Sequence, residues 1–177
     1  MRLRSRVLWI GLLLSLIPAV QADPEEPYLG LGYGVINDHQ FGQQTTQRMG
    51  LVMARFGDDL SPYYGVEAHV ATGADNAKIS AGGLSESLHL YSMANFFFKP
   101  QIKFHSFSLY GLAGVGMWRT ALTGPNLRLW NTDHGGAFGA GIRLPFTTSG
   151  RWVFDASYVQ MKNSQGYAVA GVDFRFP

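Results

Sequence analysis

The last stretch of the chain, residues 165–177, alternates between two kinds of side chain from one residue to the next. One set of positions is apolar throughout: Ala168, Ala170, Val172, Phe174 and Phe176. The other set is Tyr167, Val169, Gly171, Asp173 and Arg175. A period of two places the two sets on opposite faces of a β-strand. A soluble sheet would turn the face with the acid and the base towards water, whereas a membrane barrel would turn it towards its lumen.

The same alternation recurs along the chain and predicts eight strands. Besides the terminal strand, the expected ranges are 27–36, 46–56, 63–71, 87–98, 107–118, 137–146 and 151–161. Most of them set an apolar face against glycines or polar residues; the third opposes Val66 and Val70 to Glu67 and His69. The facing of the second strand stays open, because both of its sets are apolar. This pattern predicts an all-β fold.

The connections between these strands alternate between short and long. Residues 57–62, 99–105 and 145–150 are expected as short turns. The mostly longer connections, 37–45, 72–86, 119–136 and 162–166, are rich in Gly, Asn, Asp, Ser and Thr. Short connections at one end and long ones at the other are typical of outer-membrane barrels, whose short turns face the periplasm. Both ends of the barrel domain are then expected in the periplasm.

The amino terminus has the pattern of a secretory signal peptide. Arg2, Arg4 and Arg6 precede an apolar run of about 14 residues, and Val20-Gln21-Ala22 offers small residues for cleavage. The run is shorter than the roughly 20 residues that a membrane-spanning helix needs. We therefore expect residues 1–22 to be a signal peptide and residues 23–177 to form one barrel domain.

Composition removes several classes of function. Of the 14 Lys and Arg residues, three lie in the expected signal peptide, which leaves 11 against 12 acidic residues. No basic cluster with interleaved aromatics remains that would indicate nucleic-acid binding. The chain has no cysteine, so no disulfide framework holds it together. Its mean hydropathy of zero does not argue against a barrel, because barrel strands expose only alternate residues to lipid.

The run ARFGDDLSPYYGVEAHVATG, residues 54–73, resembles the strand, periplasmic turn and strand of a known family. This is the family of small outer-membrane β-barrels that includes OmpA-type transmembrane domains, OmpX-like proteins and opacity porins. Residues 108–116, 137–146 and 172–176 are similar to its later strands. The resemblance implies an eight-stranded antiparallel up-and-down transmembrane β-barrel in the bacterial outer membrane. It also implies that Phe174 and Phe176 form the assembly signal, although the final Pro177 departs from the usual terminal Phe.

A soluble, lipocalin-like barrel of similar length is the alternative fold. Glycines and small residues crowd the face opposite the apolar one, which suits a narrow lumen better than a solvated surface. Aromatic residues near the strand ends suggest an interfacial girdle. They are Tyr28, Tyr63, Tyr64, Phe96, Phe98, Trp118, Phe146, Trp152, Phe174 and Phe176. Both observations favour the membrane barrel.

The faces opposite the apolar ones supply a candidate constellation of charges. Its members are Glu67, His69, Arg143, Asp155, Asp173 and Arg175, and Arg55 and His89 are further candidates. The interior of an eight-stranded barrel is just wide enough for side chains to fill, so charges inside it must pair. We interpret the cluster as a salt-bridged plug that closes the lumen. The alternative is a pH-sensitive gate of a narrow pore, with His69 and His89 as the titrating groups.

No pattern indicates catalysis or a bound cofactor. A resemblance to lipid A deacylases would require His-x-Ser on one strand, but His69, His89 and His105 are followed at that distance by Ala, Tyr and Phe. The histidines are scattered and cysteine is absent, so no zinc motif exists. We expect no catalytic residues, no metal site and no cofactor.

The expected function is a structural or surface-interaction role through the extracellular loops, without enzymatic activity. The expected partners are outer-membrane lipids, lipopolysaccharide and the outer-membrane assembly machinery, with no nucleic acid and a monomeric state. Two alternatives stay open: an OmpW-like narrow conduit for small molecules, and a lipid A-modifying barrel enzyme.

Overall fold

The computed structural model describes residues 26–38, 47–81, 84–124, 127–162 and 165–176. The expected signal peptide lies outside these residues. In the described part of the chain, no helix is long and apolar enough to cross a membrane.

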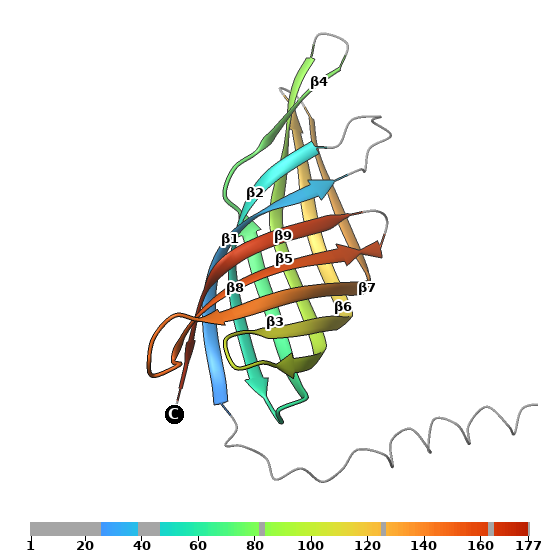
Figure 1. The fold of residues 1–177 in the computed structure, drawn as a ribbon. Coiled ribbons are helices and arrows are strands. Elements are labelled where there is room, and N and C mark those ends of the chain that lie inside the picture. The colour runs from blue at the N-terminus through green and yellow to red at the C-terminus, as the bar shows by residue number, and fades with distance from the viewer. Residues whose placement is uncertain (1–25, 39–46, 82–83, 125–126, 163–164, 177) are drawn as a thin grey trace, which may run out of the picture.

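The described strands form one closed antiparallel sheet (Figure 1). They are β1 (Glu26–Asp38), β2 (Gln47–Asp59), β3 (Tyr64–Gly73), β4 (Ala77–Ala81), β5 (Leu84–Lys103), β6 (Ser108–Gly124), β7 (Leu127–Pro145), β8 (Trp152–Met161) and β9 (Gly166–Arg175). Consecutive strands pair along the sheet, and β1 pairs with β9. Both β3 and β4 pair with β5, so they form one stave of the barrel. The prediction of an eight-stranded up-and-down barrel is confirmed.

The break between β3 and β4 has a local cause. The amide of Ala74 donates to the carbonyl of Gly50 at 2.9 Å, and the amide of Gly50 donates to the carboxylate of Asp75. Residues 74–76 thus turn towards β2 instead of continuing along β5. Beyond them, β4 and the start of β5 form a hairpin that projects at the upper end of the barrel (Figure 1).

A bulge in β5 shifts which of its side chains point inward. The register of β5 against β6 changes between Leu90 and Ser92, so Tyr91 is an extra residue. A bulged residue moves the following side chains to the other face. Leu90 before the bulge and Met93 after it are therefore both buried. The candidate His89 lies between the inward-facing Leu88 and Leu90 and so falls on the outer face, away from the charged cluster.

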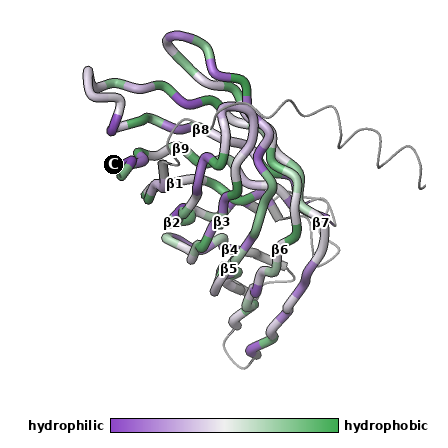
Figure 2. The backbone as a smooth tube through the Cα atoms, turned by 90° about the horizontal axis from the view of Figure 1, so that it is seen from below, coloured by the Kyte–Doolittle hydropathy of each residue, from purple (hydrophilic) through white to green (hydrophobic). Residues whose placement is uncertain are grey.

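Buried and exposed side chains alternate along most of the strands. Figure 2 shows the hydropathy of the residues changing repeatedly along the same strands. On β2, whose facing was open, Met53 and Arg55 are buried whereas Val52 and Phe56 are about half exposed. The lumen-facing side of β2 is thus the one that carries Arg55. Exposed Leu, Val, Phe and Tyr side chains cover the outside, as an apolar band facing lipid requires.

Two residues of the expected aromatic girdle lie inside the barrel instead. Tyr28 is 3% exposed and Trp118 is 1% exposed. Tyr28 alternates with the outward-facing Leu29, and Trp118 shares the inward face of β6 with Leu112. Their positions near strand ends suggested a girdle, but the period of two fixes their direction.

The long connections are more ordered than expected. Residues 119–124 and 127–136 continue β6 and β7 as a hairpin, and residues 84–86 belong to β5. Residues 99–103, expected within a short turn, also belong to β5. These segments carry polar and small residues on both faces, so they lack the alternation that marks a half-buried strand. As a result β5, β6 and β7 have 20, 17 and 19 residues, against 10 for β8 and β9. We call these three long strands the tall side of the barrel.

The seam between β1 and β9 leads to a prediction about assembly. Its register runs from Tyr28 opposite Arg175 to Asn37 opposite Gly166, and the Phe176 amide adds a hydrogen bond to the Pro27 carbonyl at 2.9 Å. An open edge in lipid leaves backbone groups unsatisfied at several kcal/mol each. Removing Phe176 and Pro177 together should therefore reduce the outer-membrane yield strongly, measured as heat-modifiable protein on detergent gels. Removing Pro177 alone is the control, and equal yields for both truncations would contradict this role of the terminal strand.

Candidate functional site

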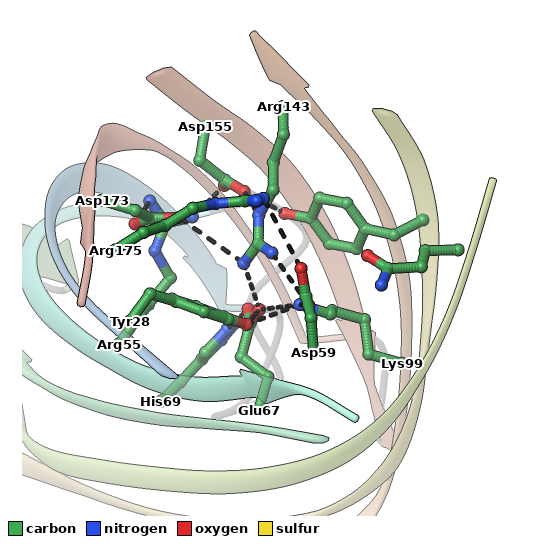
Figure 3. A network of polar contacts seen from close by, with 12 residues as sticks. Tyr28, Arg55, Asp59, Glu67, His69, Lys99, Arg143, Asp155, Asp173 and Arg175 are labelled. Atoms are coloured by element: carbon green, nitrogen blue, oxygen red, sulfur yellow. Dashed lines mark hydrogen bonds and ion pairs between the residues drawn. The ribbon is translucent and has the colours of Figure 1, made fainter. Parts of the chain in front are cut away.

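Charged and phenolic side chains converge inside the barrel at the end of the short turns (Figure 3). We call them the lumen network: Tyr28, Arg55, Asp59, Glu67, His69, Lys99, Tyr110, Arg143, Asp155, Asp173 and Arg175. All are buried except Arg175, which is half-buried at the rim. Every stave of the barrel contributes at least one member, because each strand turns alternate residues into the same narrow space.

Arg143 is the centre of the lumen network. Its guanidinium lies 2.8 Å from Glu67, 3.1 Å from Asp155 and 3.5 Å from both Asp59 and Asp173. The same group stacks over the ring of Tyr28, 4.1 Å from the centroid. A planar guanidinium has five donors in a fixed fork, which allows one cation to bind several carboxylates at once.

Arg55 and Lys99 supply the other buried positive charges. Arg55 bridges two neighbouring strands, with one nitrogen against the carboxylate of Asp155 and another 2.8 Å from Asp173. The ammonium of Lys99 lies 2.6 Å from Asp59 and donates to the hydroxyl of Tyr28 at 2.7 Å. The Tyr28 hydroxyl in turn donates to Glu67. The tyrosine therefore connects the lysine to the centre of the network.

Opposite charges in the lumen nearly balance. Within the described residues, the buried basic side chains are Arg55, Lys99 and Arg143, and the buried acidic ones are Asp59, Glu67, Asp155 and Asp173. At the rim, Arg175 lies 3.5 Å and Lys103 lies 3.9 Å from Asp59. A buried charge costs several kcal/mol unless it is paired, and this arrangement gives every buried ion an opposite charge.

His69 forms the inner boundary of the network. Its Nε2 lies 2.6 Å from Glu67, and its Nδ1 lies 2.7 Å from the hydroxyl of Tyr167, which accepts from Asn95 at 3.0 Å. One tautomer satisfies the whole chain, with Asn95 donating to Tyr167, Tyr167 to Nδ1, and Nε2 to Glu67. The ring is wholly buried. Of the two histidines in the gate hypothesis, only His69 lies in the lumen.

Above the network, the lumen is filled by apolar side chains, a layer that the charged residues alone did not predict. This apolar layer includes Ile36, Met49, Leu51, Met53, Met93, Phe97, Leu112, Trp118, Leu122, Val159 and Met161. All belong to one buried cluster, and Trp118 is its largest member. Residues 46–56 are apolar on both faces because Met49, Leu51 and Met53 face the lumen and belong to this layer. This was the one sign of the layer in the sequence.

Glycines make room for the large side chains of the lumen. Tyr28 lies directly opposite Gly57 across the β1–β2 pair, and Tyr110 lies opposite Gly141 across the β6–β7 pair. A Cβ atom on either glycine would overlap the facing tyrosine ring. Gly30 is similarly opposite Asp173, whose carboxylate occupies the space of a Cβ. The glycine-rich face predicted a crowded lumen. The lumen can hold these large side chains because a glycine lies opposite each of them.

The residues predicted to form the charged cluster do lie close together in the lumen. Glu67, His69, Arg143, Asp155 and Asp173 lie together with Arg55, and Arg175 lies at the rim. The hydrophobic and polar pattern did not indicate Tyr28, Asp59, Lys99 and Tyr110 as members of this cluster. Asp59 and Lys99 lie in ranges expected as turns, but the structure shows that β2 and β5 continue through them and turn them inward.

The two candidate assembly residues lie outside the lumen network. Phe174 contacts Trp152, with 4.9 Å between ring centroids, and Phe176, with 5.2 Å. These rings form an aromatic cluster on the outside of the barrel, at the short-turn end. Their role in assembly stays a prediction. In the described residues, no group of three or more His, Cys, Asp or Glu side chains is arranged to hold a metal ion.

Comparison with known proteins identifies the family. The family described as "Outer membrane protein beta-barrel domain" matches residues 8–176. No curated protein matches the chain significantly. Among solved structures, Ail of Yersinia pestis is similar with 18% identity and a TM-score of 0.56, covering 86% of this chain and 97% of its own. The N-terminal barrel of Pseudomonas aeruginosa OprF has 13% identity, a TM-score of 0.61 and coverages of 85% and 97%.

Neisserial surface protein A is similar in fold as well, with 12% identity, a TM-score of 0.61 and coverages of 87% and 100%. At these identities the likeness to the solved structures concerns the fold. The family match spans nearly the whole chain, so the chain belongs to the outer-membrane β-barrel family. It is a protein of the bacterial outer membrane, and its strands cross that membrane.

The first prediction from the site concerns Glu67. Replacing it with alanine removes the carboxylate shared by Arg143, Tyr28 and His69, and leaves a buried guanidinium undercompensated. Breaking a buried ion pair in this way costs about 3–5 kcal/mol, which should appear in urea unfolding of the barrel in lipid vesicles. Lys103→Ala is the control: its ammonium is partly exposed and 3.9 Å from Asp59, so the loss should stay below about 1 kcal/mol. Equal stabilities of Glu67→Ala and the parent would mean that water screens the network.

A second prediction tests the fit between glycine and carboxylate. Gly30→Ala would displace Asp173 from Arg55 and should destabilise the barrel by about 1–3 kcal/mol, as overpacking does. Gly111→Ala is the matched control, because its Cβ would meet only Pro100 at 3.4 Å and a carbonyl oxygen at 3.9 Å. Its free energy of unfolding should stay within about 0.5 kcal/mol of the parent. If both variants unfold at the same urea concentration, the close fit at Gly30 is unimportant for stability.

Proposed function

We propose that this outer-membrane barrel is a non-enzymatic protein with a closed lumen, which acts through surface contacts made by its extracellular hairpins. The observation that carries the proposal is the filling of the lumen by two layers in series. The lumen network occupies the short-turn end, and the apolar layer around Trp118 occupies the space above it. An interior filled in this way offers no path for solute, so the surface outside the membrane is left for function.

The tall side of the barrel supports this proposal. Short turns face the periplasm in this type of barrel, so the hairpins β4–β5 and β6–β7 extend outside the cell. Their strands continue the sheet beyond the ends of β8 and β9 (Figure 1). A hydrogen-bonded hairpin is a more rigid platform for contact than a long irregular loop. Two proteins of similar fold bear names that refer to such a role, an attachment invasion locus protein and a surface protein.

The two alternatives have less support. A conduit for small apolar molecules would need a lateral opening and an open apolar lumen, but the apolar layer here is packed with buried side chains. A lipid A-modifying enzyme would need a nucleophile and a base together near the outer leaflet. His69 is engaged inside the barrel with Glu67 and Tyr167, and His105 lies in a short turn at the other end.

The closed-lumen proposal predicts the outcome of two measurements. The purified barrel should give no resolved conductance in planar lipid bilayers, because both layers block the lumen. Lipid A from a deletion strain should have the same mass spectrum as lipid A from the parent strain. Steady single-channel conductance would support the conduit instead, and a changed acyl or phosphate pattern of lipid A would support the enzyme.

A further inference from the structure

The outer face of the tall side carries a cluster of cationic and aromatic residues. We call Tyr91, Arg119, Arg128 and Trp130 the arginine–tryptophan patch. On β6 and β7, Arg119 pairs with Thr132, Ala121 with Trp130, and Thr123 with Arg128, so outward side chains follow each other along the hairpin. Tyr91 joins them from the bulge of β5, where its carbonyl accepts from the Thr72 hydroxyl at 3.0 Å. All four side chains of the patch are exposed.

Both arginines of the patch lie over the same indole ring. The guanidinium carbon is 4.3 Å from the Trp130 centroid for Arg119 and 4.6 Å for Arg128. Tyr91 packs edge-on against Trp130 with 5.1 Å between centroids, and Arg119 lies 5.7 Å from the Tyr91 ring. The rings therefore hold two like charges close together and fix their orientation.

These two charges have no acidic partner among the side chains that the structure describes. No carboxylate there lies within the 4.0 Å of an ion pair with Arg119 or Arg128, in contrast to the buried cations of the lumen network. Stacking uses the face of a guanidinium and leaves its five N–H donors in the plane. Two such forks beside each other match an anion that carries several oxygens.

The patch lies at the outer edge of the apolar band. On β6 the outward residues include Leu109, Val115 and Met117, which are exposed and apolar, and the next one after Met117 is Arg119. The ten residue-to-residue steps from Leu109 to Arg119 span about 25 Å along the barrel axis at the usual rise and tilt of barrel strands. This equals the height of an apolar band in such barrels. Arg119 is thus at the level of the lipid headgroups.

A groove adjoins the patch on the same outer surface. It has a volume of about 700 Å³, and its walls include Thr72, Asn76, His89, Thr123, Arg128 and Trp130. Its floor includes the small side chain of Ala121, which lies directly across from Trp130 on the paired strand. Hydroxyl, amide and imidazole groups beside an indole ring suit a sugar, which presents both hydroxyls and an apolar face.

We propose that the arginine–tryptophan patch and its groove bind the phosphate-bearing sugar headgroup of the outer-leaflet glycolipid, the lipid A portion of lipopolysaccharide. The two guanidinium groups receive the phosphate, and the groove receives the sugar. This inference deepens the proposed function and rests on its orientation, with the long hairpins outside the cell. A lipid bound there would fix the position of the tall side relative to the membrane surface.

The test uses the whole barrel in nanodiscs of neutral phospholipid, with bisphosphorylated lipid A as the probe. The double variant Arg119→Gln/Arg128→Gln should bind lipid A at least about tenfold more weakly than the parent, a loss of about 1.4 kcal/mol or more, because it lacks the charge-assisted hydrogen bonds to phosphate. Arg48→Gln is the matched control, because Arg48 is an exposed arginine at the long-hairpin end of β2. Its affinity should stay within about twofold of the parent, in line with the small effect of a remote exposed charge.

Dephosphorylated lipid A separates the headgroup from other occupants. We expect parent and double variant to bind it equally weakly, because the arginines then have no phosphate to receive. If the double variant binds bisphosphorylated lipid A as tightly as the parent, or loses both forms equally, the proposal is wrong. Tighter binding of a soluble sulfated polysaccharide than of lipid A through the same arginines would also overturn it. None of these results depends on conductance, so failure here is distinguishable from failure of the closed-lumen proposal.

Discussion

The pairing of charges in the rest of the lumen depends on the buried guanidinium of Arg143. It lies within 3.5 Å of four carboxylates that come from β2, β3, β8 and β9. An unpaired ion in this space would cost several kcal/mol, so each carboxylate requires a cation and each cation requires its carboxylates. Because the partners come from strands far apart in sequence, the network can form only when the barrel closes. Pairing in the lumen and closure of the sheet therefore depend on each other.

The glycines follow from the same constraint. The interior of an eight-stranded barrel is just wide enough for side chains to fill. This barrel places tyrosines, arginines and a tryptophan inside. The sequence solves the problem locally by setting a glycine across from a large residue, as with Gly57 and Tyr28 or Gly141 and Tyr110. Glycine normally weakens a strand interior. Here its cost is offset by the packing of the facing ring, so the glycine pattern and the network are two parts of one solution.

The period of two determined how much of this architecture could be predicted from the sequence. It predicted the strands and the inward direction of Glu67, Arg143, Asp155 and Asp173, because each alternates with an apolar neighbour. The up-and-down barrel was indicated by the short and long connections and by the family resemblance. It did not give Asp59 and Lys99, since a strand that ends in polar residues resembles a turn. It also could not place His89, because the bulge at Tyr91 shifts the phase of β5 without a mark in the composition. Where both faces are apolar, as in residues 46–56, only closure of the barrel shows which one is inside.

The difference between the two groups of arginines connects the lumen to the proposed surface role. Arg55 and Arg143 are buried among carboxylates, with which they form ion pairs inside the protein. Arg119 and Arg128 are exposed and are held by an indole ring, which orients a guanidinium without using its donors. In the lumen, positive charge is neutralised where water and ions would otherwise enter. On the tall side, positive charge is held in place above the apolar band, and no carboxylate among the described side chains pairs with it. The same residue type thus closes the barrel at one level and, in the function proposed here, attaches it at the other.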